Sequence, residues 1–191
     1  MYTSDISKEE IQLLPLKQFD GDIWLANTHE EVLTAIEMIS RESVLGFDTE
    51  TRPSFKKGRV NKVALLQLAT KKQAWLFRLS STGLPPELVE VLSNPGILKV
   101  GLAIRDDLHA LKKLRGFEPA GFTDLQKEVS NYGIEAMGLK KLAAIVLGIH
   151  ISKAQQVSNW ENPLLTEAQL RYAATDAWVC LEIFRHLKMN P

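Results

Sequence analysis

The sequence predicts an α/β domain in which helices cover both faces of a mixed sheet. Strand-like segments follow one another closely in the first half of the chain, whereas strand-like and helical segments alternate in the second half. Two strand-like segments, VALLQLA and ILKVGLA, are almost entirely apolar, as is typical of strands covered on both faces. The order of the elements and these two segments together favour a sheet buried between helices.

The chain is expected to form one globular domain, residues 41–191, with an N-terminal extension, residues 1–40, packed on it. Within the extension, DIWLA (22–26) has the character of a short strand. The segment 28–40 carries its apolar residues on one side of a helix. No repeat and no long linker indicates a second domain.

Five strands are predicted for the sheet. The first is VLGFDTET (44–51), and a short lysine turn then joins VALLQLA (63–69) to QAWLFRL (73–79) as a hairpin. ILKVGLA (97–103) is a further buried strand. FTDLQ, near residue 122, is the candidate for the fifth strand.

Helices dominate the second half of the chain, after a short helix at PELVEVLS. The helix DDLHALKKLRG ends at Gly116, and GLKKLAAIVLG ends at Gly148. In the long final helix, Thr166 and Gln169 have the spacing of a capping box. An alanine such as Ala177 in this helix allows it to lie close against the sheet.

Composition and charge are those of a soluble globular protein. Hydrophobic residues make up 45% of the chain and charged residues 24%, which excludes a collagen-like or disordered protein. The 23 basic residues balance the 23 acidic ones, so only a local basic rim would attract a polyanion. The single cysteine, Cys180, excludes an internal disulfide and fits a reducing compartment. The N-terminus does not resemble a signal peptide and no apolar run is long enough to cross a membrane, so we expect a cytoplasmic protein without a membrane partner.

The first candidate site residues are Asp48 and Glu50, near the end of the strand 44–51. Side chains alternate along a strand, so two acids two residues apart lie on the same face. Two carboxylates about 4 Å apart repel each other by roughly 1 kcal/mol even in bulk water. Mg²⁺ or Mn²⁺, which prefer carboxylate oxygens, would compensate this repulsion. The alternative is a strand that runs out into a solvated turn.

Asp107 is the second candidate. Apolar residues define the buried stripe of its helix, namely Ile104, Leu108 and Leu111. Asp107 lies close to that stripe, whereas Asp106 lies on nearly the opposite side and is expected to face solvent. The alternative is that both acids simply favour the positive end of the helix dipole, which explains Asp106 better than Asp107.

Tyr172 and Asp176 form the third candidate pair. They are four residues apart in the final helix, so they lie one above the other on a single face. Val179 and Ile183 continue that face, which therefore looks toward the interior. A buried carboxylate requires a partner, and a metal ion, an arginine or backbone amides would each provide one.

Four inward acids from one strand and two helices have little structural reason to gather in one domain. A site for phosphoryl transfer has a strong one, because carboxylates hold its two metal ions about 3.5–4 Å apart on either side of an in-line displacement. The motifs FDTE, VGLAIRDDLHAL and YAATD resemble, in this order, the three motifs of the DEDD 3′–5′ exonucleases in the tyrosine-bearing subgroup, close to the Werner-type and ribonuclease-D-like domains. The resemblance extends from about residue 42 to residue 188.

The resemblance implies a ribonuclease-H-like fold with the acids at one end of the sheet. It also implies that two divalent cations, Mg²⁺ or Mn²⁺, bind to the acids of the motifs, which are Asp48, Glu50, Asp107 and Asp176. Tyr172 is implied as a further catalytic residue. Because an unperturbed tyrosine has a pKa of about 10, we expect Tyr172 to orient the attacking water rather than to act as a base.

The implied reaction is hydrolysis at the 3′ end of a nucleic acid, DNA favoured and RNA possible, with release of nucleoside 5′-monophosphates. The loop SFKKGRVNK follows the strand with Asp48 and is expected to hold this substrate. Its candidate substrate-binding residues are Lys56, Lys57 and Arg59 for the phosphates and Phe55 for a terminal base. A solvated hairpin loop with Phe55 packed beneath it is the alternative.

The alternative function is a catalytically silent nucleic-acid- or protein-binding module on the same fold. The presence of all four motif acids together with Tyr172 favours the enzyme. The sequence does not indicate an oligomeric state.

Overall fold

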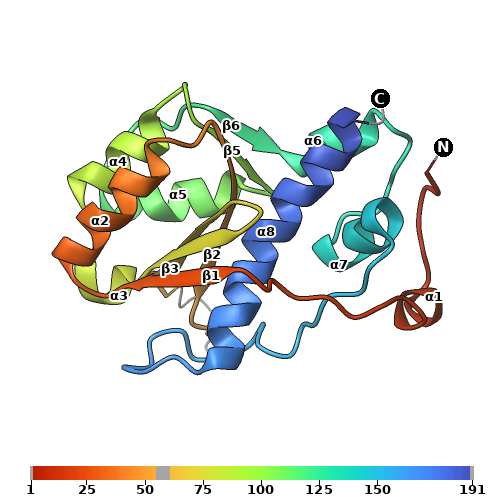
Figure 1. Ribbon diagram of the computed structural model, residues 1–191, viewed down its shortest axis with the longest axis horizontal. Coiled ribbons are helices and arrows are strands. Elements are labelled where there is room, and N and C mark those ends of the chain that lie inside the picture. Colours follow the sequence, from red (N-terminus) through yellow and green to blue (C-terminus); the bar gives the residue numbers. More distant parts are fainter. Residues whose placement is uncertain (1, 55–60, 190–191) are drawn as a thin grey trace.

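The computed structural model describes residues 2–54 and 61–189, and it contains a mixed sheet between two layers of helices (Figure 1). The strands lie in the order β1-β4-β3-β2-β5-β6. They span Asp22–Ala26 (β1), Val44–Thr51 (β2), Val63–Ala69 (β3), Gln73–Phe77 (β4), Leu98–Gly101 (β5) and Phe122–Asp124 (β6). The α/β class and the mixed sheet are confirmed.

The expectation of five strands was wrong, because the sheet of the described residues has six: β1, from the segment assigned to the N-terminal extension, also joins it. The candidate segment near residue 122 forms β6, which pairs in parallel with β5 at the edge of the sheet. The predicted hairpin is present, since β3 and β4 pair antiparallel. β2 is central: it pairs antiparallel with β3 and parallel with β5.

The helices span Lys8–Gln12 (α1), His29–Ile39 (α2), Leu79–Thr82 (α3), Pro86–Ser93 (α4), Arg105–Leu114 (α5), Leu125–Ser130 (α6), Leu139–Leu142 (α7) and Glu167–Met189 (α8). The helices predicted after residue 85 are present, but α3 and α6 were not predicted, and Leu79, assigned to the strand 73–79, begins α3. A π-helical segment, Ala143–Leu147, continues α7 and ends at Gly148, which has φ 64°. The predicted capping box at the start of α8 is present, because the Thr166 amide donates to Gln169 and the Gln169 amide donates to Thr166.

Two helical layers cover opposite faces of β2. Leu45 and Phe47 point into the core beneath α2, α4 and α5, whereas the alternating residues face α8, the long helix that crosses the other side of the sheet (Figure 1). A Cβ atom at Gly46 would lie 1.8 Å from the carbonyl oxygen of Ala177. Glycine in β2 and alanine in α8 therefore allow the close crossing that brings the two elements together.

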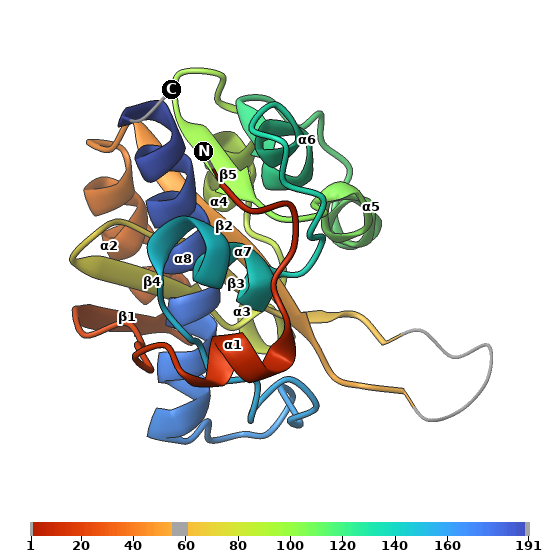
Figure 2. The ribbon, with the colours of Figure 1, turned by 90° about the vertical axis from the view of Figure 1, so that its right-hand side faces the viewer.

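The N-terminal residues also contribute to this core. β1 pairs in parallel with β4, and Val32 and Ala35 of α2 pack in the same cluster as Phe47. A domain boundary near residue 40 stays a prediction. Figure 2 shows α1 beside α7, where the Lys141 ammonium donates to Asp5 at 2.6 Å. In the part of the chain that the structure describes, no helix is both long and apolar enough to cross a bilayer.

Candidate active site

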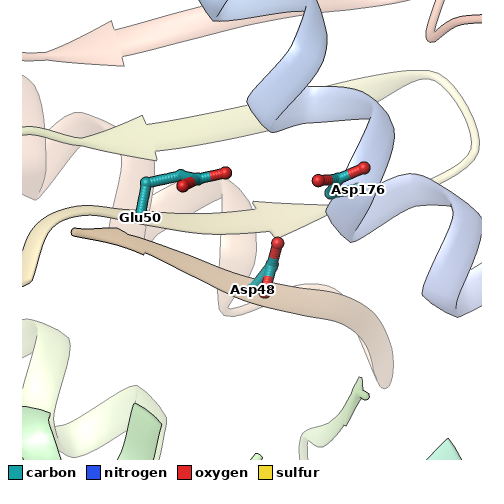
Figure 3. Close-up of side chains that lie close together, drawn as sticks. All are labelled: Asp48, Glu50 and Asp176. Carbon is teal, nitrogen blue, oxygen red and sulfur yellow. The ribbon is translucent and has the colours of Figure 1, made fainter. Parts of the chain in front are cut away.

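Three carboxylates meet where α8 crosses the end of β2. Asp48 and Glu50 come from β2 and Asp176 comes from α8, and one ligand oxygen of each lies within 4.8 Å of those of the other two (Figure 3). The alternation of β2 places Asp48 and Glu50 on the same face as Gly46, which is the face that α8 covers. The close packing at Gly46 thus positions the three acids as a cluster.

Burial makes ionisation of these acids unfavourable. It raises the pKa of Asp48 well above its ordinary value, and the charges of Asp176 and Asp107 add to the effect. Burial, followed by repulsion from Asp48, raises the pKa of Glu50 to about 10. Burial also raises the pKa of Asp176 to about 7, although a hydrogen bond with Tyr172 and the charge of Lys153 act in the opposite direction.

The residues present fit a divalent cation. Among the described residues, no lysine or arginine forms an ion pair with Asp48, Glu50 or Asp176. Carboxylate oxygens are the ligands that Mg²⁺ and Mn²⁺ prefer. The cross-strand partner of Asp48 is Gln67, whose fully buried amide has no hydrogen-bond partner in the described structure. Three carboxylates without an ion-pair partner, beside a buried amide without a hydrogen-bond partner, fit a hydrated divalent cation.

Asp107 approaches this cluster from the opposite layer. It lies in the first turn of α5 and is half-buried, whereas Asp106 is exposed, as the helix phase predicts. The Thr49 hydroxyl donates a short hydrogen bond to Asp107. Asp107 is not one of the three gathered carboxylates, but its charge contributes to the raised pKa values of Asp48 and Glu50.

Tyr172 lies one turn before Asp176 and is hydrogen-bonded to it. The tyrosine ring is tilted by 37° over Trp160, which is fully buried, with the ring centroids 6.0 Å apart. Burial, followed by the charges of Asp176 and Glu50, raises the pKa of the Tyr172 hydroxyl far above its ordinary value. The hydroxyl is therefore a neutral hydrogen-bonding group and not a base at physiological pH.

A cavity of about 140 Å³ opens beside Asp48, Tyr172 and Asp176. Lys153 and Gln156, from the irregular segment before α8, also line it. A larger cavity of about 870 Å³ between α5, β6 and α6 contains none of the three gathered carboxylates. The smaller cavity is lined by two of the three gathered carboxylates, Asp48 and Asp176.

The sequence did not identify Thr49 or Lys153, and it predicted that Gln67 bonds to backbone or site groups, without a catalytic role, whereas its amide has no hydrogen-bond partner in the described structure. Strand alternation places Thr49 on the face of β2 that points away from Asp48. Only the packing of α5 on that face shows that Thr49 contacts Asp107. Lys153 lies in a segment without periodicity, so no local signal marks it. The predicted substrate-binding residues Phe55, Lys56, Lys57 and Arg59 lie outside the described residues.

Comparison with known proteins identifies the family. The model of a 3′–5′ exonuclease family matches residues 25–190. The chain belongs to the DEDD 3′–5′ exonuclease family. It is 35% identical over 187 residues to the mouse bifunctional 3′–5′ exonuclease/ATP-dependent helicase WRN, covering 91% of this chain and 13% of that protein. It is 32% identical over 157 residues to ribonuclease D of Gluconacetobacter diazotrophicus, covering 80% of this chain and 39% of that protein.

Among solved structures, the exonuclease domain of Aedes aegypti Nibbler is similar to this exonuclease domain, with a TM-score of 0.80 and 26% identity over 91% of each chain. This likeness confirms the ribonuclease-H-like exonuclease fold. The chain spans only 13–41% of the length of the first curated relatives that it matches. The comparisons therefore establish the family and the fold of the domain. The activities of the longer relatives are properties of those proteins and are not assigned to this chain.

Proposed function

We propose that this exonuclease domain removes nucleotides one at a time from the 3′ end of a nucleic acid in a reaction that requires two divalent cations and releases nucleoside 5′-monophosphates. The observation that carries the proposal is the gathering of Asp48, Glu50 and Asp176 within 4.8 Å of one another, beside Tyr172, in a chain of this family. Such a cluster has no structural benefit without a cation, because it places like charges together where water is scarce.

The roles of the acids follow from their positions. Asp48, Glu50 and Asp176 would hold one cation, and Asp48 would reach toward the second with support from Asp107. When bound, these cations supply a water nucleophile at neutral pH and stabilise charge on the leaving oxygen. The carboxylates, of which Asp176 is buried and the other two partly buried, would confine that chemistry to one end of the sheet.

Tyr172 would orient the attacking water through its hydroxyl. Its raised pKa and its hydrogen bond with Asp176 both support an orienting role rather than a basic one. Trp160 beneath the ring limits its movement. The hydroxyl thus has a fixed position one helical turn from a metal-binding carboxylate.

DNA is the favoured substrate and RNA is possible. The similarity to a WRN exonuclease region supports DNA, and the similarity to a ribonuclease D supports RNA. Binding of the phosphates by Lys56, Lys57 and Arg59, and stacking of a terminal base on Phe55, remain part of the proposal.

The test uses 5′-labelled and 3′-labelled DNA and RNA oligonucleotides with Mg²⁺, with Mn²⁺ or with EDTA. We expect a ladder of shortened 5′-labelled products, and release of the label as a mononucleotide from the 3′-labelled strand, only with a metal ion. Asp48→Ala should abolish both. Binding without shortening on every substrate would instead support a catalytically silent module.

A further inference from the structure

A groove lies between α1 and the start of α7, two elements that are side by side in both views (Figures 1 and 2). Its volume is about 590 Å³. The amides of Glu135 and Ala136 both donate to the carbonyl oxygen of Ser4, and Lys141 donates to both carboxylate oxygens of Asp5 at 2.6 and 2.7 Å. The N-terminal segment and the segment before α7 are thus joined along the groove.

The groove is basic although the whole chain has a net charge of zero. Four lysines line it against two acids. One of these lysines, Lys141, is paired with Asp5, whereas Lys8, Lys140 and Lys153 form no ion pair with the described residues. The balance of charge therefore favours an anionic occupant.

The floor of the groove is apolar. Ile11 and Ala136 are buried along it, and Met137 has a side chain that is 59% exposed. Lysines around an exposed apolar surface match the chemistry of a single nucleic-acid strand, which presents phosphates and the flat faces of unpaired bases. A volume of 590 Å³ is within the range of small-molecule pockets, about 300–1,000 Å³, so it can hold a short stretch of one strand but not a duplex.

Lys153 connects this groove with the active site. It lines the groove and it also lines the cavity that contains Asp48, Tyr172 and Asp176. Its charge reaches Asp176, where it acts against the effect of burial. A chain that leaves the acid cluster past Lys153 therefore enters the basic groove.

We infer that the groove between α1 and α7 binds the phosphates of the single strand on the 5′ side of the nucleotide being removed. The inference rests on the proposed function and adds to it a path for the substrate. Lys153 contacts the strand next to the cleaved bond, and Lys140 and Lys8 contact phosphates farther along. The N-terminal helix α1 is thus one wall of the substrate site.

The test measures binding in EDTA, where cleavage does not occur, by fluorescence anisotropy of a labelled single strand of about ten nucleotides. The double variant Lys8→Glu/Lys140→Glu should weaken binding about tenfold or more. Because each single-strand phosphate contact contributes about 0.7 to the slope of log K against log salt, the loss of two contacts should reduce that slope by about 1.4.

Lys71→Glu/Lys72→Glu is the matched control, because it makes the same change in charge at exposed positions in the β3–β4 turn. That turn lies beside Gly46, at the opposite end of β2 from Glu50. We expect the control to bind as the wild type does. Equal binding by wild type and the Lys8/Lys140 variant would overturn the inference, as would an equal loss in both double variants.

A second measurement separates this inference from the proposed function. With Mg²⁺, the Lys8/Lys140 variant should lose far more kcat/KM on the ten-nucleotide strand than on a dinucleotide, which is too short to reach Lys8. If the wild type cleaves neither substrate, the proposed function fails. If the wild type cleaves both and the variant shows the same loss on both, only the groove fails. The unfolding temperature of Lys8→Ala/Lys140→Ala is measured as well. A weaker-binding variant that unfolds at the wild-type temperature excludes misfolding as the cause of the loss.

Discussion

At the scale of single residues, the site depends on carboxylates that have lost much of their hydration. Burial raises the pKa of Glu50 to about 10 and that of Asp176 to about 7. The folded chain without a cation therefore holds protons that the unfolded chain would release at neutral pH. A divalent cation removes this cost, because its charge favours the ionised carboxylates.

Glu50→Gln is expected to stabilise the metal-free protein. The ordinary pKa of Glu50 is 4.5 and its folded value is about 10, so folding retains a proton between these pH values. The contribution of Glu50 to stability is thus fully present below pH 4.5 and is lost as the pH rises toward 10. At pH 8 in EDTA, the variant should unfold about 2–4 °C higher, which corresponds to about 1 kcal/mol. Thermal unfolding from pH 5 to pH 9 measures this, and an equal pH dependence in both proteins would contradict it.

Tyr172→Phe is expected to lower kcat about a hundredfold, roughly the lower end of what removal of one positioned hydrogen-bond donor costs. The ring keeps its packing on Trp160, since only the hydroxyl is removed. The rise in unfolding temperature on addition of Mn²⁺ should remain close to that of the wild type. A variant with the wild-type kcat would show that the hydroxyl does not orient the water.

At the scale of elements, the crossing of β2 and α8 is what assembles the site. Gly46 and Ala177 allow the backbones to approach, and the next side chain on the same face of the strand is Asp48. Any increase in this separation moves Asp176 away from its partners on the sheet. Packing and metal binding therefore depend on the same contact.

Gly46→Ala is expected to destabilise the fold by about 1–3 kcal/mol, the usual cost of an added methyl group in a packed core. The new Cβ would lie 1.8 Å from a backbone oxygen of α8. Gly116→Ala is the control, since nothing lies within 4 Å of its added Cβ. Urea unfolding compares the two variants. A loss for Gly116→Ala equal to that of Gly46→Ala would contradict the account.

At the scale of the whole molecule, the acids come from three layers. Asp48 and Glu50 belong to the sheet, Asp176 to the helix on one face and Asp107 to a helix on the other. A cation held among them would link these layers to one another. Metal binding is therefore expected to stabilise the entire fold.

Mg²⁺ or Mn²⁺ should raise the unfolding temperature of the wild type. At a concentration about 100 times the dissociation constant, the gain is about 2.7 kcal/mol, or roughly 5–10 °C for a chain of this size. Asp48→Asn should remove most of this gain, whereas NaCl at equal ionic strength should not reproduce it. A wild type that does not respond to either cation would contradict the metal site.

Local pattern was enough to predict several features of the site. Alternation along β2 placed Asp48 and Glu50 on one face, and helix phase separated the half-buried Asp107 from the exposed Asp106. Apolar runs predicted the central strands. These features depend on the period of side chains along one element, which the sequence contains directly.

Other features depend on which element covers a given face, and only the tertiary structure decided them. β6 has three residues, too few to show a period. The hydrogen bond from Thr49 to Asp107 joins segments far apart in the chain, and so does the groove that reaches Lys153. The buried amide of Gln67 lacks a hydrogen-bond partner among the described residues because of how distant segments pack around it. The sequence by itself determined the fold class and the face of each motif acid, because these follow from local patterns, and its three motifs indicated the family by resemblance. The contacts between layers followed only from packing, because backbone approach at residues such as Gly46 decides which faces meet.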